Sequence, residues 1–153
     1  MSYYELLKFV HVVMAIIWVG GAITIQVLAF RILKTNDPIR LSNLTGDAGV
    51  LGERLFAPAS GILVIMGVLM VLDSGWDFSD TWIVIGIALY VVSVVIGAAF
   101  LSPLSEKITA GLSAGGPPDA ALQEQIKKVV MLSRIDLVIL VLVVADMVIK
   151  PGM

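Results

Sequence analysis

The chain of 153 residues contains no cysteine and only one histidine. The missing cysteines exclude disulfide bonds, thiolate metal sites and cysteine nucleophiles, and they leave the redox compartment undetermined. Charged residues are also scarce, at 14% of the chain, and the formal net charge is only -2. Because the basic residues are scattered, the sequence shows no electrostatic footprint for binding nucleic acid.

The sequence also lacks the motifs of the common enzyme classes. It has no nucleotide-binding loop, no serine or cysteine triad, no catalytic carboxylate pair and no zinc motif. The first nine residues, MSYYELLKF, have neither the basic region nor the small-residue cleavage site of a signal peptide. We interpret them as the start of a retained helix. The sequence leaves enzymatic activity undecided and favours a non-enzymatic role.

Apolar residues dominate what remains, because 59% of the chain is hydrophobic and the mean hydropathy is +1.02. A helix needs about 20 apolar residues to span a bilayer, and its backbone groups are then all paired internally. Four runs meet this requirement, at about residues 4–33, 54–72, 82–101 and 133–149. The sequence therefore predicts an all-α polytopic membrane protein, one transmembrane domain folded as a four-helix up-down-up-down bundle.

The connections between these runs differ in length and charge. In the first, Asp37 and Pro38 are placed to open a short helix, and three glycines then predict a loosened segment. In the second, Trp76 and Trp82 stand where interface anchors are expected. The third is expected to break at residues 114–118 before a helix restarts.

Basic residues predict the orientation, because cytoplasmic segments retain Lys and Arg. Eight of the ten flank the first and third connections, and only Lys8 and Lys150 lie on the other side. Both termini are therefore expected outside, in a multi-pass protein of the bacterial inner membrane.

One face of the first run combines polar and small side chains. At spacings of three or four residues the stripe contains His11, Ala15, Trp18, Ala22, Gln26 and Ala29. The other faces are Val, Ile and Leu, which suit lipid. We expect the stripe to face partner helices or a ligand.

His11 is the main candidate for chemistry, because an ionisable group inside a span is costly. Met66, Met70 and Met147 are predicted at a similar depth, so an imidazole with thioethers suggests a haem axial set or a Cu(I) site. Met66 is the first choice for the second haem ligand, and Asp146 is a candidate to hold the other imidazole nitrogen.

Structural alternatives stand beside each of these roles. His11 can be an interfacial or hydrogen-bonded residue, the methionines can be core filler, and Asp146 can pair with Lys150 four residues on. Trp18 can stack on a planar ligand or fill space between helices, which is the favoured role.

A second polar cluster is predicted at the cytoplasmic ends of the second and fourth runs. It comprises Glu53, Arg54, Arg134 and Asp136. Residues two apart on a helix do not face each other, so cross-helix ion pairs are expected. We interpret this cluster as a structural clasp.

Two segments resemble a known group of proteins. LLKFVHVVMAIIWVGG resembles the first helix of small bacterial membrane proteins that include predicted integral membrane proteins of unknown function, the copper-resistance D family and the HemJ membrane protoporphyrinogen oxidases. GERLFAPASGILVIMGVLMVL resembles the second helix of the unknown-function members. The resemblance implies a bundle that holds b-type haem or copper, with His11 as the ligand.

Three functions therefore remain as hypotheses. The leading one is a haem-associated or redox-associated role through His11. The second is a cofactor-free accessory or assembly subunit, either homo-oligomeric or part of a larger membrane complex, with small residues as docking surfaces. The third is copper handling.

Overall fold

The computed structural model describes residues 2–113 and 119–152, and every regular element in these ranges is helical. The predicted break at residues 114–118 lies outside them. The helices, with two π-helical turns labelled η, are α1 (Tyr3–Leu33), α2 (Pro38–Leu51), η1 (Gly52–Phe56), α3 (Ala57–Ser74), α4 (Thr81–Val95), η2 (Ile96–Leu101), α5 (Ser102–Ser113) and α6 (Ala120–Ile149).

Local sequence signals set where α1 begins. The Ser2 hydroxyl accepts a hydrogen bond from the Glu5 amide at 3.2 Å, and the Ser2 amide donates to the Glu5 carboxylate at 2.7 Å. This is a capping box, which satisfies amides that the first helical turn leaves unpaired. The helix then continues for 31 residues, about 46 Å at 1.5 Å per residue, which exceeds the ~30 Å hydrocarbon core.

The second helical segment begins as predicted but does not break. The Asp37 carboxylate accepts from the amides of Ile39 and Arg40, and Pro38 occupies the first turn. The predicted loosening at the glycines is wrong, because the helix runs on through η1 to Ser74. Each interior glycine costs only about 1 kcal/mol, and α2 packs against α5 along its length, which offsets that cost.

The two long helices that combine α2 with α3 and α4 with α5 share a design. Each contains a π turn near its middle, at η1 and η2. A π turn inserts an extra residue, so the helix changes the face it presents to its neighbours. In both cases the apolar half lies on one side of the turn, and the more polar α2 or α5 lies on the other.

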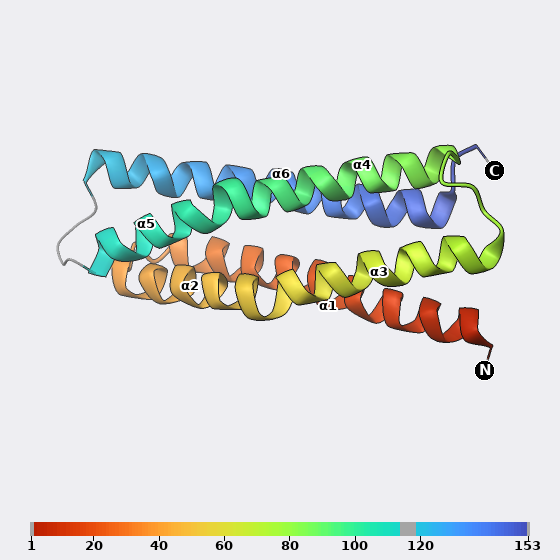
Figure 1. Cartoon of the computed structure of the whole chain (residues 1–153). Helices are drawn as coiled ribbons and strands as arrows, with labels where there is room; N and C mark the ends of the chain where they lie inside the picture. Colours follow the sequence, from red (N-terminus) through yellow and green to blue (C-terminus); the bar gives the residue numbers. More distant parts are fainter. Residues whose placement is uncertain (1, 114–118, 153) are drawn as a thin grey trace.

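The described helices form the rods α1, α2 with α3, α4 with α5, and α6. These run alternately in opposite directions, so that both ends of the chain lie on the same side of the bundle (Figure 1). α1 packs beside α3, α4 beside α6, and α2 beside α5, while α1 also contacts α6. The α2–α5 contact joins the two pairs at the end opposite the termini (Figure 1). We call this end, comprising α2, α5 and the first half of α6, the polar end.

Large apolar side chains cover the outside of the rods. Leu72 is 67% exposed, Ile16 65% and Val138 59%, whereas few apolar side chains are buried. A water-soluble protein of this size buries such residues, so their outward placement is that of a protein in lipid.

Within residues 2–113 and 119–152, three helices are long and apolar enough to cross a membrane. They are α1, the helix of α2 to α3 (Pro38–Ser74) and the helix of α4 to α5 (Thr81–Ser113). The apolar half of α6 carries Arg134, Asp136 and Asp146, and α6 is not among the three.

A tight turn and an aromatic cluster close the end that holds the termini. Gly75 ends α3 with φ 76°, a left-handed conformation that only glycine adopts without strain. In the turn, the Ser79 amide and hydroxyl donate to Asp77, which lowers the pKa of that carboxyl. Trp76 and Trp82 then meet edge to face, with ring centroids 5.0 Å apart.

Candidate functional site

The stripe on α1 faces the inside of the bundle and meets a different helix at each polar residue. His11 contacts α3, Trp18 packs edge to face on Tyr90 of α4 with centroids 5.6 Å apart, and the Gln26 side-chain amide donates to the Ser133 hydroxyl of α6 at 2.6 Å. The hydroxyl of Tyr90 in turn donates to the Ser60 carbonyl. Trp18 therefore fills space between helices.

His11 is held against α3 through one ring nitrogen. Its Nδ1 lies 2.8 Å from the carbonyl oxygen of Leu63. Because a carbonyl only accepts, Nδ1 carries the proton, and in the neutral imidazole Nε2 therefore keeps its lone pair. A Cβ added at Gly67 would lie 3.3 Å from His11 Cε1, so the missing side chain at Gly67 allows this close approach. A backbone carbonyl on the second nitrogen is the usual way of orienting an imidazole that binds a metal.

Asp146 does not take either role predicted for it. The Leu63 carbonyl, and not Asp146, holds the His11 ring. Lys150 caps α6 in a left-handed conformation, with φ 48°, and places Nζ over the rings of Trp76 at 3.9 Å and Trp82 at 4.9 Å. The ammonium therefore forms cation–π contacts in place of the predicted ion pair with Asp146.

Asp146 is instead buried without a hydrogen-bonding partner. It is 8% exposed, and within the described residues neither carboxylate oxygen is hydrogen-bonded. It faces α4, because a Cβ added at Gly86 would lie 3.2 Å from its Oδ2. The indole nitrogen of Trp82 is likewise buried and unpaired in this part of the chain.

The predicted clasp at the cytoplasmic ends is wrong. Asp136 is buried and accepts a hydrogen bond from the Ser93 hydroxyl of α4 at 2.5 Å. Glu53, Arg54 and Arg134 are exposed, and none of the four residues forms an ion pair in the ranges that the structure describes. Helix periodicity explains this result, since Arg134 and Asp136 lie on different faces and only Asp136 faces α4.

The methionines are distributed over two neighbourhoods. Met66 and Met70 are half-buried on α3, and Met66 directly precedes Gly67, which contacts His11. Met147 instead packs with the buried cluster of Val71, Trp82 and Ile83. Its methyl group also occupies the space that a Cβ at Gly86 would need. Met147 thus acts as filler between α4 and α6.

The chemistry of the site is that of a single ligand. Among the described residues no group of three or more His, Asp, Glu or Cys side chains could hold a metal ion. His11 Nε2 offers one nitrogen, and Met66 and Met70 are thioethers on α3, the helix that His11 contacts. A group that binds here needs only one strong protein ligand.

Two important residues were not recognised as polar partners from the sequence. Ser93 is 1% exposed, and its hydroxyl is hydrogen-bonded to Asp136. Tyr90, three residues before it, contacts Trp18. Because they are three residues apart, Tyr90 and Ser93 lie on one face of α4. The sequence signal that could have identified them is the presence of hydroxyl groups on a helix face that also contains a glycine.

Comparison with known proteins identifies the family. Residues 5–151 match a family model described as "Predicted integral membrane protein (DUF2269)". Neither comparison with curated proteins nor comparison with solved structures gives a match. The family model covers nearly the whole chain, and its description agrees with the outward-facing apolar surface and the three long apolar helices. The chain therefore belongs to this family of integral membrane proteins of unknown function.

Proposed function

We propose that α6 is a fourth membrane span and that the protein is a four-span up-down-up-down bundle of the bacterial inner membrane. The acidic residues on α6 support this, because Asp136 and Asp146 are buried inside the protein and do not meet lipid. The outward face of the same segment is apolar: Val138, Val141, Leu142, Val144, Val148 and Ile149 are all exposed. A helix with buried acidic residues on one face and exposed apolar residues on the other can pack against the bundle with the first face and contact lipid with the second.

In this proposal the termini face outward. Eight of the ten basic residues lie in or next to α2, α5 and the first half of α6 or in the adjoining η1, the side that the positive-inside rule assigns to the cytoplasm. Alkaline phosphatase fused after Met153 should therefore be active, because it folds only in the outer compartment. The same enzyme fused after Ser113 serves as the control and should be inactive. An inactive fusion after Met153 together with an active one after Ser113 would invert the topology.

The function we propose is binding of b-type haem through Nε2 of His11. The observation that supports it is the hydrogen bond from His11 Nδ1 to the Leu63 carbonyl. In the neutral imidazole this bond fixes the tautomer with the proton on Nδ1, so that Nε2 has a lone pair available for a metal. When bound, haem would supply one-electron redox chemistry at its iron. The chain would supply the axial nitrogen, its orientation and an apolar surrounding that excludes water.

The residues of one chain provide one strong ligand for a haem iron, the imidazole of His11. With one histidine in the sequence, two imidazoles on the same iron require two copies of the chain. Met66, on the helix that His11 contacts, is the thioether that we propose as the second ligand in a monomer. A His/Met pair raises the reduction potential relative to two histidines.

Titration of the purified chain with haem b in mild detergent tests this proposal. We expect a shifted, saturable Soret band, at one haem per chain for His/Met ligation or one per two chains for ligation by two copies. A chain that leaves the spectrum of free haem unchanged would contradict haem binding. If that chain instead competes with a chelator for Cu(I), copper handling replaces haem binding.

A second candidate is an accessory or assembly subunit without a cofactor. A specific observation favours it: Gly61 and Gly97 have open space where a Cβ would stand, so no described part of this chain packs closely against them. Small residues left unused on a membrane helix allow a partner helix to approach. Such a subunit would be colourless alone and would co-purify with a larger membrane complex.

A further inference from the structure

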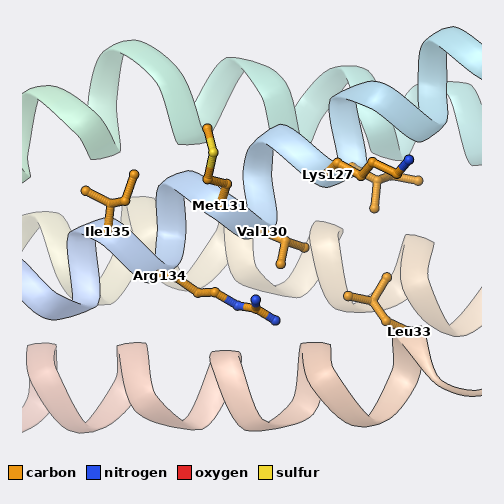
Figure 2. A pocket seen from close by; sticks show the side chains of 7 residues that line it. Leu33, Lys127, Val130, Met131, Arg134 and Ile135 are labelled. Carbon is orange, nitrogen blue, oxygen red and sulfur yellow. The ribbon is translucent and has the colours of Figure 1, made fainter.

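A groove opens between the end of α1 and α6, where the polar end meets the apolar part of the bundle. Its volume is about 420 Å³. Most of its lining is apolar, but two cations join it, as Figure 2 shows; the lining residues are Leu33, Ile126, Lys127, Val130, Met131, Arg134 and Ile135. A neighbouring hollow of about 400 Å³ shares Leu33, Ile126 and Lys127 and extends toward the start of α2.

The charge of this groove is unbalanced. The first hollow has two cationic side chains in its lining and no carboxylate. Within the described residues neither Lys127 nor Arg134 forms an ion pair, whereas Lys128 beside them pairs with Glu124 at 2.9 Å. The one carboxylate lining the second hollow, Asp37, is engaged by Arg40 and by the first amides of α2. The groove therefore complements an anion.

The groove leads onto the apolar half of α6. It follows α6 from Ile126 to Ile135, about 13 Å at 1.5 Å per residue, and beyond Ile135 the outward face of the helix stays apolar at Val138 and Leu142. The Arg134 side chain leaves α6 and extends toward α1, on the side where Leu33 lies (Figure 2). The long stems of Arg and Lys pack on apolar surface in this way and keep their charge at the headgroup level.

We propose that this groove binds a phospholipid with an anionic headgroup, such as phosphatidylglycerol. The phosphate lies between Lys127 and Arg134, and one acyl chain continues from there past Ile135 over the exposed apolar side chains of Val138 and Leu142. The headgroup is the source of the anion, because a free phosphate would leave the apolar length of the groove uncovered. Basic pockets between helices at the cytoplasmic side of a membrane protein are typical sites for such lipids.

Native mass spectrometry of the full chain tests the proposal, with dioleoyl phosphatidylglycerol and dioleoyl phosphatidylcholine competing at equal concentration. The wild-type chain should retain phosphatidylglycerol preferentially. Each cation near a membrane surface contributes about fivefold to the affinity for anionic lipid, so the double variant K127Q/R134Q should bind about 25-fold more weakly. Both residues are exposed, so the variant should keep its helical content.

Two further variants separate this site from general charge effects. Lys128→Gln removes the same charge one residue away but outside the groove lining, and it should bind like the wild type. Val130→Trp fills the apolar part without changing charge, and it should lose the lipid. Equal loss in Lys128→Gln, full binding in K127Q/R134Q or Val130→Trp, or equal displacement by inorganic phosphate alone would overturn the proposal.

Discussion

Replacing His11 with alanine is expected to abolish the Soret band of the haem-loaded protein. His11 is the only imidazole in the chain, so the variant loses its single strong nitrogen ligand for iron. The fold should survive, since the lost hydrogen bond to Leu63 has a net worth of about 1 kcal/mol and the spans keep their internal backbone bonds. Absorption spectroscopy with far-UV circular dichroism on the same sample measures both effects.

Gln26→Leu provides the matched control. Gln26 lies on the same stripe of α1, and its side-chain amide likewise forms one hydrogen bond to another helix, with the Ser133 hydroxyl as acceptor. Its loss should change stability by a similar small amount and leave the Soret band intact. A band that persists in His11→Ala would remove His11 as the ligand, and loss of the band in both variants would show that any disturbance of the stripe is sufficient.

The polar stripe of α1 shows how much of the structure of a membrane protein can be predicted from its sequence alone. Helical spacing predicted that His11, Trp18 and Gln26 share a face, and all three contact other helices. Spacing within one helix is a property of local geometry and can be deduced from the sequence. The identity of the neighbours cannot: they belong to α3, α4 and α6 respectively, and no local rule decides which helix approaches which face.

The acidic residues of α6 show the same limit. Asp136 was expected to form a cross-helix ion pair, because the ends of the second and fourth runs were predicted to adjoin, but it faces α4 and accepts a hydrogen bond from Ser93. An ion pair between Asp146 and Lys150, four residues on, was one of the two roles considered for this carboxylate. The helix ends at Lys150 in a left-handed conformation that takes its ammonium to the tryptophans. Pairing rules based on spacing fail where a helix ends.

The sequence also failed to predict that the two long helices are continuous, and the reason here is a different one. Three glycines between the first two spans predicted a loose connector, since each lowers helix propensity. Packing of α2 on α5 supplies stability from outside the segment, and the π turns at η1 and η2 absorb the change of face. Tertiary contacts therefore override a local preference, which is the common outcome for propensity.

The unpaired carboxylate of Asp146 predicts an unusual gain in stability. Replacing Asp146 with leucine should raise the free energy of unfolding by about 2 kcal/mol, because a buried ionisable group without hydrogen bonds costs more than an apolar group of similar shape. The branched leucine side chain places two methyl groups near the positions of the carboxylate oxygens, beside Gly86. Reversible unfolding in mixed detergent micelles, followed by far-UV circular dichroism, measures the change.

Ser93→Ala is the control with the opposite sign. Ser93 lies on α4 and donates the hydrogen bond to Asp136, which lies on α6 as Asp146 does. Ser93→Ala removes this donor, so the free energy of unfolding should fall by about 1–3 kcal/mol. The contrast between the two variants depends on whether each carboxylate has a partner. If Asp146→Leu instead lowers stability as Ser93→Ala does, the carboxylate must bind a partner in the membrane, such as a cation or a water molecule. If it raises stability, the membrane protein keeps a destabilising charge at this position, which is the pattern of a residue retained for function.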